Sequence, residues 1–164
     1  MAARLIPSEF LVEKQRANAV LTLSSGESAR GCFFTAGGSA RHAGPERVSD
    51  LLNSDTGFFP FEVHDTDGSR TVLFNRSHVV MVVLGDNEAS RDPGYSVAKR
   101  HAVSLLLSTG QRVVGAIRVY RPEGRDRLSD WALHPEAFQY VEAADATFIV
   151  NMAHIIDVHE VFEP

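Results

Sequence analysis

Two copies of the pattern Arg-x-Ser-Asp, at residues 47–50 and 127–130, are the first residues whose types and spacing suggest chemistry. A guanidinium held in a loop beside a serine and a carboxylate can bind a phosphate or carboxylate ligand. On this hypothesis Arg47, Asp50, Arg127 and Asp130 are ligand-binding residues. The alternative is structural, and we favour it because serine and aspartate are common caps of short turns and the arginine can pair with an acid.

An asparagine followed three residues later by a histidine also occurs twice, as Asn75 with His78 and Asn151 with His154. Asparagine is frequent in tight turns, so the pattern predicts a reversal before a strand. Two histidines facing each other would supply only half of a zinc site, which also needs thiolate or carboxylate ligands. We therefore expect histidines bonded to backbone carbonyl groups, and we predict no metal site.

Sequence motifs of common enzymes are missing from the chain. It has no nucleophile elbow, phosphate-binding loop, dinucleotide fingerprint or His-Glu-x-x-His zinc motif. Cys32 lies between Gly31 and Phe33 in an apolar segment, which is typical of a small core residue and not of a nucleophile. We expect a protein that is not an enzyme and uses no cofactor.

The composition excludes several classes of protein. The chain has 164 residues, 44% of them hydrophobic and 23% charged, which allows a packed core and argues against disorder. Its formal charge of −5 argues against a binder of duplex DNA. The single cysteine cannot form an internal disulfide, and no apolar run suits a signal peptide or a membrane span. These features predict a cytoplasmic location.

The same landmarks appear twice in the same order, which predicts an internal duplication. Each series has an apolar strand ending in a Ser/Thr-Gly turn, a second glycine, the Arg-x-Ser-Asp pattern, one or two phenylalanines and the Asn-x-x-His pattern. A polar stretch without periodicity separates the two series. We place the first copy and its leading segment at residues 1–84, a linker at 85–97 and the second copy at 98–164.

Each copy reads as five short strands, so the expected fold class is all-β. The strands are predicted at 20–23, 28–35, 58–64, 71–74 and 79–84, and at 103–107, 112–120, 138–143, 147–150 and 155–161. Five strands in so few residues are typical of a small, bent barrel of the Sm or SH3 type. One such copy has a thin core, so we expect two barrels packed as a pseudo-dimer. Residues 7–16 read as a short helix or as an early start of the first strand.

Aromatic residues suggest an interaction surface. Phe58, Phe59 and Phe61 fall in a run that holds more aromatic side chains than one buried strand face can take. We therefore predict that one of them meets the other copy or a partner chain, and we assign these residues and Trp131 to an interface. The predicted function is a non-catalytic binding or assembly module that associates with itself or with another protein.

The motifs resemble those of an uncharacterised group of bacterial domains with the signature Arg-Leu-Ser-Asp-x-Leu-Asn. The first copy keeps the fuller form, which ends at Asn53, whereas the second copy has Leu133 at that place. More distantly, the strand order looks like the Sm fold of RNA-binding rings, in which an Asp…Asn pair and an Arg-Gly contact RNA. This resemblance implies RNA-binding roles for Asp50, Asn53 and Arg76, although no glycine follows Arg76. The alternative function is thus a regulator that binds a small anion or single-stranded RNA at the Arg-x-Ser-Asp loops.

Overall fold

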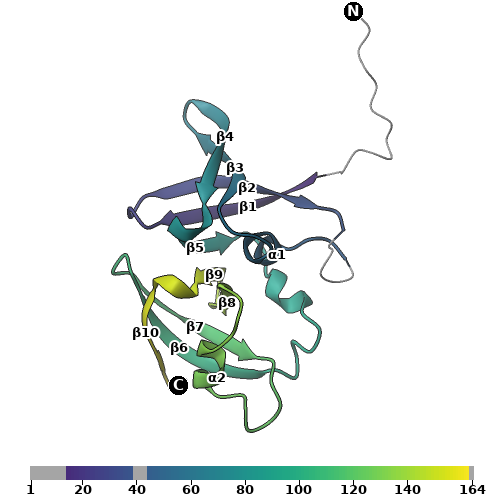
Figure 1. Cartoon of the computed structure of the whole chain (residues 1–164), viewed down its shortest axis with the longest axis vertical. Coiled ribbons are helices and arrows are strands. Elements are labelled where there is room, and N and C mark those ends of the chain that lie inside the picture. The colour runs from purple at the N-terminus through teal and green to yellow at the C-terminus, as the bar shows by residue number, and fades with distance from the viewer. Residues whose placement is uncertain (1–13, 39–43, 163–164) are drawn as a thin grey trace, which may run out of the picture.

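The computed structural model describes residues 14–38 and 44–162, and within them it shows an all-β fold, as the sequence predicts. Ten antiparallel strands form one sheet in the order β10-β6-β7-β8-β9-β5-β1-β2-β3-β4. Figure 1 shows the first five strands in the upper half of the molecule and the last five in the lower half. No helix in these two ranges is both long and apolar enough to cross a lipid bilayer.

Strand positions agree closely with those expected from the sequence. The first half contains β1 (Lys14–Leu23), β2 (Ser28–Ala36), α1 (Val48–Asn53), β3 (Phe58–Asp65), β4 (Gly68–Asn75), η2 (Arg76–His78) and β5 (Val79–Leu84). The second half contains β6 (Lys99–Leu107), β7 (Arg112–Val119), α2 (Leu128–Ala132), β8 (Phe138–Glu142), β9 (Thr147–Asn151), η4 (Met152–His154) and β10 (Ile155–Glu160). Between them, η3 (Glu88–Arg91) lies in the linker. Of the two alternatives for residues 7–16, the early start of the first strand holds for residues 14–16, which belong to β1, and residues 7–13 fall outside the described residues.

The two halves are joined through their strands. Each half has the same internal order, β5-β1-β2-β3-β4 in the first and β10-β6-β7-β8-β9 in the second, and β5 pairs with β9. The expected pair of closed barrels is not seen, because the edges that would close each half are used differently. One edge of each half joins the other half, and the remaining edges, β4 and β10, are the open ends of a single sheet.

Two glycines allow strands within each half to approach closely. A Cβ atom on Gly31 would lie 1.7 Å from the carbonyl oxygen of Glu62, and one on Gly115 would lie 2.8 Å from that of Glu142. Both distances are far below normal van der Waals contact, so any larger residue would push the neighbouring backbone away. The second glycine of each series is therefore required by strand packing.

Two hydrophobic cores exchange side chains across the boundary between the halves. The core of the first half includes Phe138 and Ile149 from the second half. The core of the second half includes Val80 and Met81 from the first half. If the halves were separated, the side chains that each contributes to the other's core would be exposed to water. The two halves therefore stabilise one another.

Candidate functional site

The pairing of β5 with β9, here called the internal junction, is the most informative contact in the molecule. Its ladder sets Met81 opposite Val150, Val82 opposite Ile149, Val83 opposite Phe148 and Leu84 opposite Thr147. Because side chains alternate along a strand, one face of this ladder enters each core. Val82 and Ile149 pack into the first core, whereas Met81 and Val150 pack into the second.

Asn53 holds the start of β8 at this junction. Its Nδ2 donates to the carbonyl oxygen of Phe138 at 3.0 Å, and its Oδ1 accepts from the amide of Phe138 at 2.9 Å. The side-chain amide of Asn53 thus makes the two hydrogen bonds that a neighbouring strand would otherwise make with the backbone of Phe138. Phe138 itself is only 3% exposed.

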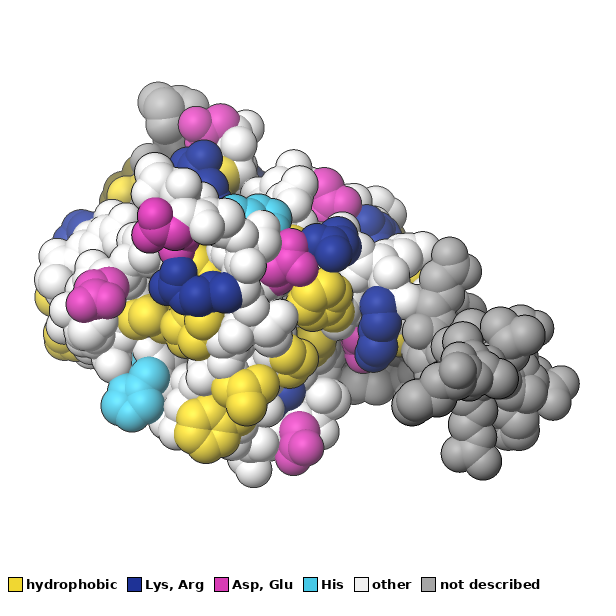
Figure 2. All heavy atoms as spheres, turned by 90° about the horizontal axis from the view of Figure 1, so that it is seen from above, with side chains coloured by type: hydrophobic (Ala, Val, Ile, Leu, Met, Phe, Trp, Pro, Cys, Tyr) yellow, Lys and Arg dark blue, Asp and Glu magenta, His cyan; other side chains and the backbone are white. Residues whose placement is uncertain are grey.

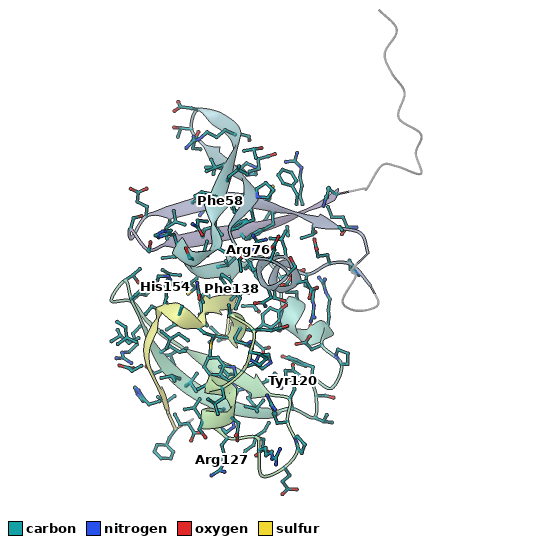
Figure 3. All side chains as sticks on the ribbon, in the orientation of Figure 1. Phe58, Arg76, Tyr120, Arg127, Phe138 and His154 are labelled. Carbon is teal, nitrogen blue, oxygen red and sulfur yellow. The ribbon has the colours of Figure 1, made fainter. Side chains whose placement is uncertain are left out.

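Asn151 and His154 make further bonds across the internal junction. The Nδ2 of Asn151 donates to the carbonyl oxygen of Val79 at 3.0 Å, while its Oδ1 accepts from the amide of Ala153. The Nε2 of His154 lies 2.7 Å from the carbonyl oxygen of Ser77, and its Nδ1 lies 2.8 Å from the hydroxyl of Ser108. The histidine is therefore bonded to a backbone carbonyl, as the sequence suggests. Figure 3 labels both His154 and Phe138 at the level where the two halves meet.

Asn75 and His78, the counterparts of Asn151 and His154 in the first half, make the same local hydrogen bonds. They do not lie at the internal junction. Asn75 Oδ1 accepts from the amide of Ser77, and His78 Nδ1 lies 2.8 Å from the hydroxyl of Ser24. Within residues 14–38 and 44–162, no acceptor is found for Asn75 Nδ2 or for His78 Nε2. These are the two atoms whose counterparts bind across the internal junction.

Large apolar side chains are exposed at both open ends of the sheet. Leu73 is 63% exposed on β4, Phe58 is 64% exposed on the neighbouring β3, and Ile156 is 63% exposed on β10. Leu133, which follows α2, is 79% exposed. Figure 2, which views the first half from above, shows exposed hydrophobic side chains among charged ones on this face.

The other predicted interface residues lie in the cores and are not available to a partner. Phe59 is 1% exposed and Phe61 is 0% exposed, and both rings pack against Phe33 in the first core. Trp131 is 3% exposed in the second core. The prediction of contact with a partner chain is therefore wrong for these three residues, whereas the cores in which they lie do include side chains of the other half. The aromatic run alternates, and the residues that point inward fill the core while Phe58 points outward.

The Arg-x-Ser-Asp patterns begin the two short helices. In each, the aspartate accepts a 2.9 Å hydrogen bond from the backbone amide of the arginine, Arg47 to Asp50 and Arg127 to Asp130. The Arg47 side chain also bonds Asp92 in the linker and is 13% exposed, so two carboxylates already neutralise it. The Arg127 side chain is 74% exposed. The capping interpretation accounts for the recurrence of the pattern.

Arg76 stabilises the loop that precedes β3. It is 9% exposed, and it donates to the carbonyl oxygens of Phe58 at 2.9 Å and Leu51 at 3.0 Å. Burial lowers the pKa of this guanidinium. With Asn53 and Arg47 also engaged, three of the candidate side chains in the first half are used within the fold, whereas the Arg127 side chain is exposed. Figure 3 shows Arg76 near the middle of the molecule and Arg127 at its lower end, so the six candidates do not form one site.

A buried carboxylate connects the linker to both halves, and no pattern in the sequence indicates it. Glu88 is 4% exposed, and its two oxygens accept from the amides of Val48 and Ser49 at 2.9 and 3.0 Å. The hydroxyl of Tyr140 donates to it at 2.8 Å. Burial raises the pKa of Glu88, while these three hydrogen bonds oppose the rise. Glu88 thus caps the first turn of α1 and links it to β8.

One group of described side chains has three metal-binding donor atoms within 4.8 Å of one another: Cys32, Glu62 and His64. Their positions in the sequence show no familiar ligand spacing. Comparison of the chain with protein-family models, with curated proteins and with solved structures finds no match.

Proposed function

We propose that this chain is a non-catalytic self-assembly module, built from two copies of one Sm-like unit. In this proposal, molecules associate head to tail when β4 of one molecule pairs with β10 of the next. The strand order supports the idea, because β4 and β10 are the counterparts of β9 and β5, which already pair inside the chain. Open strand edges are templates for such pairing.

One observation carries the proposal: residues exposed at the open edges are counterparts of residues that act at the internal junction. Phe58 and Phe138 occupy matching places, since each lies opposite an asparagine in its ladder. Three more exposed residues have counterparts at matching positions of the other half: Leu73 matches Ile149, Ile156 matches Val80, and Leu133 matches Asn53. The first two of these counterparts are fully buried, and Asn53 binds the backbone of Phe138.

The internal junction also predicts the register of the intermolecular one. By correspondence, Leu73 lies opposite Val158, and Phe74 lies opposite Asp157. Leu133 replaces Asn53 and meets the backbone of the next molecule's Phe58. The unused Nδ2 of Asn75 and Nε2 of His78 would then reach the carbonyl oxygens of the next molecule's Ile155 and Ala153, the counterparts of Val79 and Ser77.

The intermolecular junction is more polar than the internal one, which favours reversible association. Where β5 has Met81, β10 has Asp157, and where β5 has Leu84, β10 has Glu160. Charged residues on an edge strand weaken indiscriminate pairing. The two joining surfaces differ from each other, so the contact is heterologous and repeats into a ring or a filament.

The decisive experiment uses two edge variants and their mixture. Phe58→Asp with Leu73→Asp blocks the β4 edge, and Leu133→Asp with Ile156→Asp blocks the β10 edge. Light scattering after size-exclusion chromatography should show wild-type mass rising with concentration. Each variant alone should be monomeric, and their equimolar mixture should form a one-to-one dimer through the two intact edges.

The control is Val114→Asp, because Val114 is 60% exposed on β7, away from both edges. This variant should assemble like the wild type. A wild-type protein that stays monomeric at about 100 μM, or a mixture that stays monomeric, contradicts head-to-tail assembly. Assembly that survives in both edge variants contradicts it as well.

A further inference from the structure

Cys32 on β2 and Glu62 on β3 lie directly opposite each other in the ladder between these strands. His64 follows Glu62 by two residues, so its side chain leaves the sheet on the same face. The Sγ of Cys32, a carboxylate oxygen of Glu62 and a ring nitrogen of His64 all lie within 4.8 Å of one another. We propose that these three side chains bind a thiophilic divalent cation of the zinc class.

The donor set suits this chemistry. Thiolate, imidazole and carboxylate are the usual protein ligands of zinc, and three of them leave a fourth position for water. Metal–ligand bonds of about 2.0–2.3 Å place tetrahedral donors roughly 3.3–3.8 Å apart. The Nε2 of His64 is already 2.9 Å from Oε1 of Glu62, and the His64 side chain is 41% exposed. Modest rotation of the two β3 side chains therefore brings all three donors to a metal, with Cys32 fixed beneath them.

A cation already lies against these donors. The Nη1 of Arg16 is 2.5 Å from Oε1 of Glu62 and 4.0 Å from Sγ of Cys32. The Arg16 side chain is 60% exposed, so it can leave towards solvent without opening the core. Arg16 is therefore a competitor for the metal, and its removal should strengthen metal binding.

The second half provides an internal comparison. Ala116 lies opposite Glu142 there, as Cys32 lies opposite Glu62, and Ala144 follows two residues later. The carboxylate is present but the thiol and the imidazole are not. Glu142 instead pairs with Arg118 at 2.9 Å and bonds the hydroxyl of Tyr95. The proposal thus predicts one metal ion per chain, in the first half only.

Cobalt titration of the chelator-treated full chain tests the site, because Co²⁺ bound to a thiolate gives an intense charge-transfer absorption. We expect one equivalent of Co²⁺ per chain with this absorption, and its loss when Zn²⁺ is added. Removal of one ligand in His64→Ala should weaken Co²⁺ binding at least about tenfold. Arg16→Gln should strengthen binding, and Arg125→Gln, which removes an arginine from an exposed loop of the other half, should leave it unchanged.

Cys32→Ser should abolish the absorption and leave the circular dichroism spectrum intact. If this core substitution unfolds the protein, His64→Ala and Arg16→Gln still decide the question, since both change exposed side chains. A wild-type chain that binds Co²⁺ without thiolate absorption overturns the proposal. Equal affinity in the wild type and His64→Ala overturns it too.

Discussion

Phe58 and Phe138 occupy matching positions, each opposite an asparagine in the ladder between the third and fourth strands of its half, but they meet different surroundings. Phe138 is 3% exposed and Phe58 is 64% exposed. The difference arises because β9 is covered by β5, whereas β4 has no neighbour on its outer side. The same side chain thus fills a junction in one half and is left at an open edge in the other.

Substitution of adjacent phenylalanines should separate folding from assembly. Phe58→Asp should change the free energy of unfolding by less than about 0.5 kcal/mol, because surface substitutions are usually mild, and should reduce the assembled mass. Phe59→Asp buries a charge in the first core and should prevent folding. Urea unfolding and light scattering measure the two effects. Loss of folding in Phe58→Asp would contradict its assignment as an edge residue.

Loss of the Asn53 side chain should weaken the internal junction. Asn53→Ala leaves the amide and carbonyl groups of Phe138 without their partner, and leaving buried polar groups unsatisfied costs about 1–3 kcal/mol each. We expect the free energy of unfolding to fall by about 2–4 kcal/mol. Leu133→Ala, at the matching place in the second half, is the control and should leave the stability of the monomer nearly unchanged. Similar losses in both variants would argue against a specific role for Asn53.

The two close-packed glycines should tolerate a methyl group to different degrees. Gly31→Ala puts a Cβ at 1.7 Å from a carbonyl oxygen, and Gly115→Ala puts one at 2.8 Å. Both variants should lower the midpoint of thermal unfolding, the first by more than the second. Gly37→Ala, where no atom lies within 4 Å of the added Cβ, is the control. Equal midpoints in all three variants would show that β2 and β3 can separate freely.

The buried Glu88 should make stability depend on pH. Burial raises the pKa of Glu88 in the folded state above the ordinary value of 4.5, so folding favours the protonated carboxyl. Its contribution to the free energy of unfolding is therefore largest below pH 4.5 and declines as the pH rises through the folded pKa. Glu88→Gln has no titratable carboxyl at this position, so its stability lacks this contribution.

Urea unfolding between pH 4 and 8 measures that difference. The free energy of the wild type minus that of Glu88→Gln should decrease with rising pH. Asp145→Asn, which changes an exposed acid that does not act on Glu88, should run parallel to the wild type. A constant difference between the wild type and Glu88→Gln would show that burial does not shift the pKa of Glu88.

The strands could be predicted from local signals. Apolar runs, Ser/Thr-Gly turns and the Asp-Gly hairpin before Ser69 indicate where strands begin and end. The union of β5 with β9 could not be predicted, because edge pairing depends on two surfaces far apart in the sequence. The recurring Asn151 and His154 were visible as a pattern, but their partners across the junction appear only in three dimensions.

The chemistry of individual side chains was harder to foresee. Glu88 looks like an ordinary linker acid, and its burial results from α1 and β8 packing around it. Arg76 resembles a ligand-binding arginine by type and position, yet its two terminal nitrogens donate to backbone carbonyl oxygens. Cys32 and His64 are brought together by the register of β2 with β3, which no spacing in the sequence encodes.

In the proposed head-to-tail assembly through β4 and β10, the covalent linker means that halves are always added in pairs. Each chain contributes two five-stranded halves, so tethered β5–β9 junctions alternate with untethered β10–β4 junctions. A closed assembly then contains an even number of halves, however many chains it has. In the proposed assembly, dilution would separate only every second junction, and the species released would be a whole chain with both of its cores still shared between its halves.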